Sequence, residues 1–454
     1  MPPTAPYSYL TWIQLRQALA LRLNDVGNVC WTDGELKVLL GESLRSWNAI
    51  TQWYVVEWTE TFGSTDKEWQ SLANSANSLV GANSSSPRYQ TLSDVDLYTL
   101  IEYHLLEPPT GATWTGTNQF SLNDLTQSFK RRRDQILQLT AANVGLFSPS
   151  LSIVPGTNRV QLPDSTSLGI LDIRRVRYLP ASGDPITLFR DDTLAMEYFS
   201  PDFPQESGDP MAWGILGSPP QAITFDTLAN QPNSLDILAI LGGSTVSSPS
   251  PLLIPDDWAW VMKWGMISDL LSKEAESNDR MRASYAEQRF QEGIRLMMEL
   301  PWLMQARIDN VPCDSPAVEE MDQYDLGWES RSDAQMGIVR GGIDLFAVSP
   351  KPSGNVSVSL SLVGSAPVPV ADGDYVQLPR ENINAILDEA EHLAQFRHGG
   401  QEFLHSIPLH QNFIQAAMDS NRRVRESGIF ATTLRPPVSR QSEVDPRYAL
   451  KEQS

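Results

Sequence analysis

The spacing of the apolar residues changes twice along this chain of 454 residues. Up to Phe147 they recur every three or four positions, which is the period of an amphipathic helix. From Ser152 to Gly243 short apolar runs are separated by Pro, Gly and Asp, a rhythm typical of antiparallel strands. Helical spacing returns after Pro255. This order predicts an α+β fold: a helical bundle core with an inserted antiparallel β domain and an extended C-terminal tail.

The helices expected in the first third begin at residues that can cap them. Thr32 and Glu35 form a capping-box pattern before a long apolar stripe. Thr11, Ser93 and Ser121 are placed to cap three further helices. Because the β domain is an insertion, its two ends must lie close together. The helices before and after it are therefore expected to pack together.

The changes of pattern divide the chain into six segments. The last of them has few apolar residues and no periodicity, so we expect it to be ordered only when a partner holds it. The segments are an N-terminal helical part (1–147), the inserted β domain (148–253), a helical hairpin or bent long helix that completes the bundle (254–300), a long connection with short β strands (301–380), the C-terminal helices (381–427) and an extended docking tail (428–454).

The charge of the chain limits its partners. There are 55 Asp and Glu against 34 Lys and Arg, a formal net charge of −21. A surface this acidic repels nucleic acid, so sequence-specific DNA binding is disfavoured, although DNA could pass such a surface without sticking. From the charge alone, simple solubility is the better explanation. The 13 Trp residues suit protein interfaces.

Cysteine content and hydropathy restrict the class of protein further. Cys30 and Cys313 lie far apart without a CxxC motif, so neither a disulfide framework nor a cysteine zinc site is expected. Residues Met1–Leu10 lack the pattern of a signal peptide. The longest apolar stretch, Leu252–Leu271, is interrupted by charged residues, so we expect no membrane contact.

A search for enzyme motifs finds no GxGxxG after a strand, no GxxxxGK[ST], no HExxH and no GxSxG. Glu57 and Glu60 lie near Trp53 and Trp58, which suggests a sugar-cleaving cleft. Glycosidase carboxylates, however, normally face each other from separate elements. A helix with an acidic exposed edge explains these residues better. We therefore expect no enzyme activity, no catalytic residues and no cofactor.

The histidines are predicted to be solvated or to lie at interfaces. Four of the five fall in one C-terminal stretch, but their spacing does not place two of them at i, i+4 on one helix face. No metal site is therefore expected. The five are His104, His392, His398, His405 and His410.

One concentrated basic run, Lys130-Arg131-Arg132-Arg133, lies within an amphipathic helical pattern. In a chain this acidic we expect it to have an acidic neighbour, and it is a candidate contact with a phosphate group or with another subunit. The alternative is a solvated helix face on which the arginine stems cover apolar surface.

Four segments, in order, carry a resemblance to a known family. They are "WTDGELKVLLGESLRSW" (31–47), then "NRVQLPDS" with "ILDIRRVRYL" (158–179), then "IPDDWAWVMKWGMISDLLSKEAESNDRMRASYAEQRFQEGIRLM" (254–297), and finally "HLAQFRHGGQEF" with "FIQAAMDSNRRV" (392–424). In pattern and order these resemble the head–tail adaptor, or connector, proteins of the neck of tailed bacteriophages.

The resemblance implies a structural virion protein at the head–tail junction, assembled in the host cytoplasm. Such adaptors form a homo-oligomeric ring, commonly of twelve subunits, beneath the portal protein, and they contact tail proteins. Genomic DNA passes the ring without sequence-specific binding. The helices would form the ring wall, and the β domain would project outward or toward the tail.

The C-terminal stretch from Arg397 has eight Lys and Arg against six Asp and Glu, which suits docking on an acidic partner. The candidate docking residues are Arg422, Arg423, Arg425, Arg435, Pro436, Pro437, Arg440, Arg447 and Tyr448. Two alternatives stay open. The chain is either another virion tail part, such as a nozzle or baseplate subunit, or a carbohydrate-binding or carbohydrate-cleaving protein.

Overall fold

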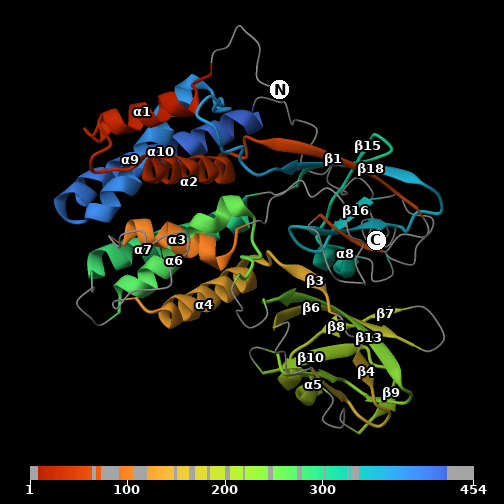
Figure 1. Cartoon of the computed structure of the whole chain (residues 1–454). Coiled ribbons are helices and arrows are strands. Elements are labelled where there is room, and N and C mark those ends of the chain that lie inside the picture. The colour runs from red at the N-terminus through yellow and green to blue at the C-terminus, as the bar shows by residue number, and fades with distance from the viewer. Residues whose placement is uncertain are drawn as a thin grey trace, which may run out of the picture.

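The computed structural model describes residues 9–63, 68–72, 92–105, 120–147, 151–162, 169–180, 185–199, 205–217, 220–243, 249–273, 279–300, 303–324, 328 and 337–426. The fold is α+β, as predicted. A helical body, the inserted β domain and a second β region make up the molecule (Figure 1).

The helical body draws its helices from both sides of the inserted domain. Thr11, Thr32, Ser93 and Ser121 each accept a hydrogen bond from the backbone N–H three residues on, which confirms the predicted caps. The helices are α1 (Trp12–Arg22), α2 (Asp33–Thr51), α3 (Asp94–His104), α4 (Leu122–Thr140), α6 (Ala259–Leu271), α7 (Arg280–Glu299), α9 (Ile383–His398) and α10 (Gly400–Glu426), with a short 3-10 turn η1 (Asp256–Trp258) before α6.

One continuous apolar core joins these helices. Trp12 of α1, Trp47 of α2 and Trp264 of α6 all belong to it, together with Phe413 of α10. The helices on either side of the insertion therefore pack together, as expected. The inserted domain leaves the body after α4 and rejoins it before η1.

The inserted domain has a core of its own, which includes Ile173, Trp213 and Phe225. Its main sheets have the strand orders β3-β13-β6-β7, with β4 also on β13, and β5-β11-β10-β8. The pairs are antiparallel except β8 with β10 and β9 with β12. The strands are β3 (Val144–Leu146), β4 (Leu151–Ile153), β5 (Arg159–Gln161), β6 (Ile170–Leu179), β7 (Ile186–Thr187), β8 (Phe189–Arg190), β9 (Ser207–Gly208), β10 (Ala212–Leu216), β11 (Ala222–Phe225), β12 (Leu228–Ala229) and β13 (Asn233–Leu241), with helix α5 (Thr193–Phe199).

The second β region joins segments that are far apart in the sequence. One sheet has the order β1-β18-β14-β15 and another the order β16-β17-β2. Residues 301–380 are thus more than a connection. They form two sheets, and strands from the N-terminal part of the chain add to both. The elements are β1 (Val55–Phe62), β2 (Trp69–Ser71), β14 (Leu303–Ile308), β15 (Val311–Cys313), α8 (Val318–Tyr324), β16 (Gly337–Arg340), β17 (Leu345–Ser349) and β18 (Val356–Val363), followed by a 3-10 turn η2 (Arg380–Asn382).

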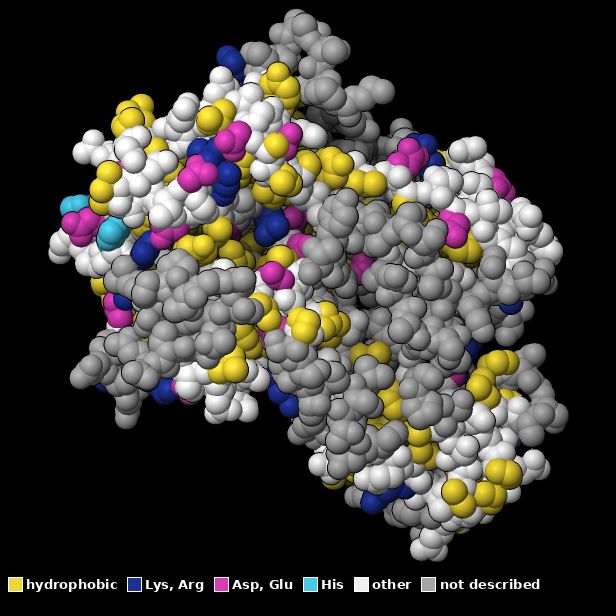
Figure 2. All heavy atoms as spheres, viewed as in Figure 1, with side chains coloured by type: hydrophobic (Ala, Val, Ile, Leu, Met, Phe, Trp, Pro, Cys, Tyr) yellow, Lys and Arg dark blue, Asp and Glu magenta, His cyan; other side chains and the backbone are white. Residues whose placement is uncertain are grey.

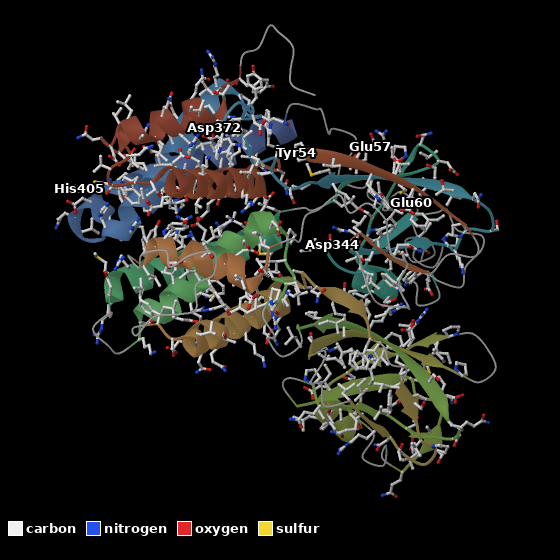
Figure 3. The ribbon with its side chains drawn as sticks, in the orientation of Figure 1. Tyr54, Glu57, Glu60, Asp344, Asp372 and His405 are labelled. Atoms are coloured by element: carbon white, nitrogen blue, oxygen red, sulfur yellow. The ribbon has the colours of Figure 1, made fainter. Side chains whose placement is uncertain are left out.

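The expectation of a helix around Glu57 and Glu60 is wrong, because both residues lie on β1 (Figure 3). The segment is rich in Val and Thr, which favour strands, and its aromatic residues Trp58 and Phe62 fall on the buried face. Both aromatic rings pack edge-on or tilted near Phe346, at 5.7 and 6.0 Å between ring centroids. Packing on β17 therefore overrides the helical spacing seen in the sequence.

Helices α6 and α7 approach closely at two glycines. A Cβ atom added at Gly293 would lie 2.5 Å from Cγ2 of Val261, and one added at Gly265 would lie 2.8 Å from Cδ2 of Phe290. Neither helix could come this close to its neighbour with a larger residue at these positions.

We predict that Gly293→Ala lowers the free energy of unfolding by about 1–3 kcal/mol, because the added methyl group overpacks the contact. Gly34→Ala is the matched control, since Gly34 lies in α2 and nothing is within 4 Å of its would-be Cβ. That change should stabilise the helix by up to about 1 kcal/mol. Urea unfolding at neutral pH measures both, and equal effects would contradict the close packing.

Candidate functional site

The basic run on α4 pairs with acids of the same chain. Arg131 forms an ion pair with Asp269 of α6. Arg132 is buried, its Nε donates to Asp269 Oδ1 and Oδ2 at 3.1 Å, and its Nη2 donates to Glu287 Oε2 of α7 at 2.7 Å. The expected acidic neighbour is therefore intramolecular and fastens α4 to the α6–α7 pair.

The other two cations of the run lie in different surroundings. Arg133 is fully buried, and its Nη2 donates to the backbone oxygen of Gly243 at 3.3 Å, where the inserted domain ends. Its Nε lies 3.3 Å from Asp134 Oδ1. Lys130 is exposed. Contact with a phosphate or another subunit remains a prediction, with Lys130 the member of the run best placed to make it.

For three of the histidines the expectation of a solvated or interface position is wrong, because His104, His392 and His410 are buried in the helical body. The turn at Gly399 folds α10 back on α9, so the His392 and His410 rings stack 5.4 Å apart. His398 and His405 are exposed, and His405 lies at the outer edge of the helical body (Figure 3). The spacing of the histidines in the sequence did not predict this pairing, because the two rings lie on different helices that the turn at Gly399 brings together.

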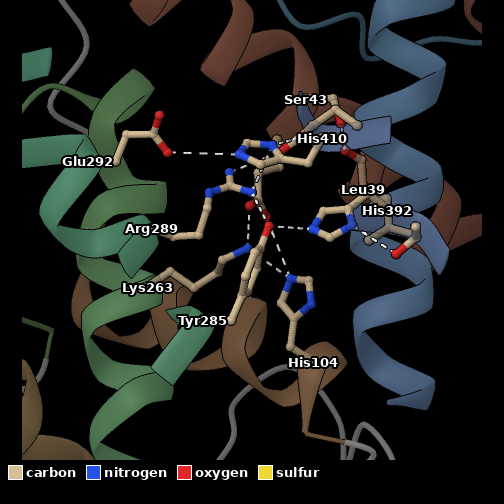
Figure 4. Close-up of polar contacts among 12 residues, drawn as sticks. Leu39, Ser43, His104, Lys263, Tyr285, Arg289, Glu292, His392 and His410 are labelled. Atoms are coloured by element: carbon tan, nitrogen blue, oxygen red, sulfur yellow. Dashed lines mark hydrogen bonds and ion pairs between the residues drawn. The ribbon is translucent and has the colours of Figure 1, made fainter. Parts of the chain in front are cut away.

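These histidines belong to a buried polar cluster between α2, α3, α6, α7, α9 and α10 (Figure 4). Lys263 is completely buried on α6 and forms an ion pair with Glu42 of α2. Its Nζ also donates to Nε2 of His104 at 2.9 Å, which requires the neutral ring. Burial by itself would raise the pKa of Glu42, but Lys263 and His104 lower it to about 2.

A second buried ion pair lies beside the first. Arg289 Nη2 of α7 donates to Glu389 Oε1 of α9 at 3.0 Å, and both side chains are almost completely buried. His410 Nδ1 is 2.8 Å from Glu389 Oε2. Burial opposes ionisation of Glu389, but His410 and Arg289 hold its pKa well below the usual range. The two cations, Lys263 and Arg289, thus have two carboxylate partners.

A chain of hydrogen bonds continues from Arg289 to α10. Arg289 Nη1 donates to the Tyr285 hydroxyl at 3.1 Å, and that hydroxyl donates to His392 Nε2 at 2.6 Å. Ser406 Oγ donates to the backbone oxygen of Phe403 at 2.7 Å, so it accepts from His392 Nδ1 at 2.9 Å. This chain fixes His392 as the neutral tautomer with its proton on Nδ1.

Aromatic rings enclose the cluster. Trp264 is fully buried, with Lys263 Nζ 4.6 Å and the Arg289 guanidinium 5.1 Å from its ring centroid. Phe396 meets the Trp264 ring edge-on at 4.8 Å. These contacts place both cations over a π face in a buried region, where electrostatic interactions are stronger than at the surface.

The cluster is suited to holding the helices together. Its charged groups form ion pairs with one another. Within the described part of the chain, no group of three or more His, Cys, Asp or Glu side chains is arranged to hold a metal ion. Removing one partner of such a buried pair typically costs about 3–5 kcal/mol. One sequence signal pointed here: Lys263 is the one charged residue in residues 259–267 of α6, and every residue of that helix except Asp269 is buried.

Of the candidate docking residues, only Arg422 has a described side chain. It is exposed, and its Nη2 lies 3.5 Å from Asp419 Oδ1. Arg423 and Arg425 lie in the last turn of α10. The remaining candidates, Arg435, Pro436, Pro437, Arg440, Arg447 and Tyr448, lie outside the described residues.

Comparison with models of known protein families and with curated proteins finds no match for this chain. Among the described helices, none has the length and apolar content needed to cross a membrane.

We predict that acidification destabilises the fold through its buried histidines. Burial lowers the pKa of His392 to about 3, below the ordinary 6.5. The unfolded chain then binds more protons between those values, so stability is complete above pH 6.5 and falls as the pH drops. At pH 5.5 this one residue accounts for about 1.4 kcal/mol.

His392→Gln removes the titration while still being able to accept from Tyr285 and donate to Ser406. Urea unfolding at pH 7.5 and pH 5.5 measures how much the free energy of unfolding falls between the two. This decrease should be about 1.4 kcal/mol smaller in the His392→Gln variant than in the unaltered protein. The control His405→Gln changes an exposed ring, so a difference confined to His392→Gln assigns the effect to the buried site. An unaltered slope in His392→Gln would contradict the assignment.

Proposed function

We propose that this chain is a structural protein of a tailed bacteriophage virion. Twelve copies form a ring that joins the capsid portal to the tail and lines the passage for DNA. The observation that carries the proposal is the presence of two separate exposed apolar surfaces on one subunit. The order of the four sequence segments supports the same role.

The first surface, called here the α1 surface, surrounds helix α1. Ile13 and Leu21 lie on its outer side, and Val26 and Val29 follow in the loop to α2, Val29 being 86% exposed. Val370 is 87% exposed and belongs to the segment that runs alongside, where the Ile13 N–H donates to the backbone oxygen of Asp372 at 3.2 Å. A partner that covered these five aliphatic side chains would remove apolar area from water, which favours association.

The second surface, called here the β-domain surface, lies on the inserted domain. It consists of Phe189, Leu194, Tyr198 and Met211, all more than half exposed. Figure 2 shows hydrophobic side chains on the outside of both the helical body and the inserted domain. In Figure 1, α1 lies at the top and α5 at the bottom, so the two surfaces are well separated.

Two unlike surfaces on one subunit suit head-to-tail association. A symmetric dimer uses the same patch on both copies, whereas a ring needs each subunit to contact its two neighbours through different surfaces. A ring of this kind could bind a portal coaxially, because the two assemblies would share a central rotation axis. A nozzle or baseplate subunit would meet the same need, and binding to the portal separates these alternatives.

The electrostatics support a passage that does not hold DNA. The chain carries a net charge of −21, and Arg131 and Arg132 of its one concentrated basic run are paired with Asp269 and Glu287. Acidic surface charge acts over roughly 8–10 Å at physiological salt, which keeps a duplex from adhering.

The carbohydrate alternative was suggested by the carboxylate pair Glu57 and Glu60. These residues are three apart on β1 and point to opposite faces of the strand, so they do not form a pair across a cleft.

The test is the assembly state of the full-length protein, alone and with the portal protein of the same phage. Native mass spectrometry and negative-stain microscopy should show a closed ring that binds the portal coaxially. Leu21→Ser with Val29→Ser should weaken ring formation at least tenfold without changing the melting temperature, because both side chains are exposed. Val311→Ser, at another exposed site, should have no effect.

A protein that stays monomeric at every concentration, with and without the portal, would contradict the proposal. So would rings that form but bind only other tail proteins, which would favour the nozzle or baseplate alternative.

A further inference from the structure

The β-domain surface has a definite construction. The Phe189 N–H donates to the backbone oxygen of Met211 at 2.9 Å, which places the main chain just before β10 against the edge strand β8. Helix α5 packs on β10 and carries Leu194 and Tyr198 one turn apart, 73% and 81% exposed. These exposed apolar side chains thus lie where the edge strand β8, the start of β10 and helix α5 meet.

Carboxylates border this area directly. Asp192 Oδ1 accepts the Leu194 N–H at 2.8 Å, and Asp226 Oδ1 accepts the Met211 N–H at 3.0 Å. Asp191 and Asp209 are exposed close by in the sequence. Asp209 Oδ1 accepts from the Tyr178 hydroxyl at 3.0 Å. The apolar side chains of the surface thus have carboxylates beside them, of which Asp191 and Asp192 are exposed.

The nearest cation in the sequence does not neutralise these carboxylates. Arg190 Nη2 donates to Asp172 Oδ1 at 3.1 Å, and its Nη1 donates to the backbone oxygen of Ile173 at 3.0 Å. Its guanidinium also lies over the Trp213 ring, 5.6 Å from the centroid. Its charge is thus directed toward the domain's own sheet. A partner for the β-domain surface should accordingly combine apolar side chains with positive charge.

The chain itself contains such a segment. Residues 427–440, "SGIFATTLRPPVSR", follow α10 and include no acidic residue. They offer Ile429, Phe430 and Leu434 as apolar anchors, with Arg435 and Arg440 as cations. Arginine can bind a carboxylate in bidentate fashion, and the two prolines reduce the entropy lost when the segment is ordered on a surface.

We propose that residues 427–440 of one copy bind the β-domain surface of a second copy. Helix α10 lies in the helical body at the top of Figure 1, whereas α5 and β10 lie at the bottom, so the segment starts from the opposite end of its own subunit. The inference rests on the proposed function in one respect, since a ring sets copies side by side. Fourteen extended residues span about 50 Å, enough to cross from one subunit to the next.

Photo-crosslinking in the full-length protein tests the contact. Tyr198→p-benzoylphenylalanine places a reactive ketone on the β-domain surface. With equal amounts of ¹⁴N and ¹⁵N protein assembled together, we expect crosslinks to residues 427–440 that join peptides of different isotope. Val311→p-benzoylphenylalanine is the matched control at an exposed site and should give no such product. Crosslinks only within one isotope, or none to this segment, would overturn the proposal.

A binding measurement tests the chemistry. A fluorescein-labelled peptide of residues 427–440, titrated with the full-length protein, should bind saturably and more weakly as salt rises. Leu194→Ser and Asp192→Asn should each weaken binding at least fivefold, and together at least tenfold. Leu21→Ser, on the α1 surface, should leave the affinity unchanged. Equal affinity for the Leu194→Ser protein would overturn the proposal.

The outcome is independent of ring formation. Rings without the mixed-isotope crosslink would reject the tail contact and leave the proposed function in place. Peptide binding and mixed crosslinks in a protein that never closes into a ring would support the tail contact and reject the ring.

Discussion

The pair of buried ion pairs around Trp264 is the interaction on which the helical body depends. Lys263 with Glu42 and Arg289 with Glu389 link α2, α6, α7 and α9 at one place, where all four side chains are buried. Desolvating such ions costs several kcal/mol each, so a packing that separated either pair would leave a buried charge without its partner. We expect this to favour the observed register of the helices.

A body held in this way can serve as a rigid support. Its charges are used internally, including Arg131 and Arg132, which bind α4 to α6 and α7 through Asp269 and Glu287. Among the described residues, the outside carries exposed acidic side chains and includes the two apolar surfaces, on α1 and on the inserted domain. Those are the properties of a part that associates with neighbours, which is why a structural role is proposed.

Local patterns in the sequence predicted much of the fold but little of the buried cluster. The caps at Thr32 and Ser121 and the period change at Phe147 are short-range features, and the structure has helices and strands where they indicate. The strand at Glu57 was missed because its partner, β18, lies about three hundred residues away. The pairing of His392 with His410 depends on how α10 folds back on α9, which no residue spacing specifies.

Locating this protein in intact phage particles tests the proposed role most directly. Electron microscopy of virions labelled with an antibody against the chain would place it with respect to the capsid and the tail. The proposed role predicts label at the head–tail junction, with several copies around the particle axis. Label on the capsid shell or at the far end of the tail, or a virion without this protein, would contradict it.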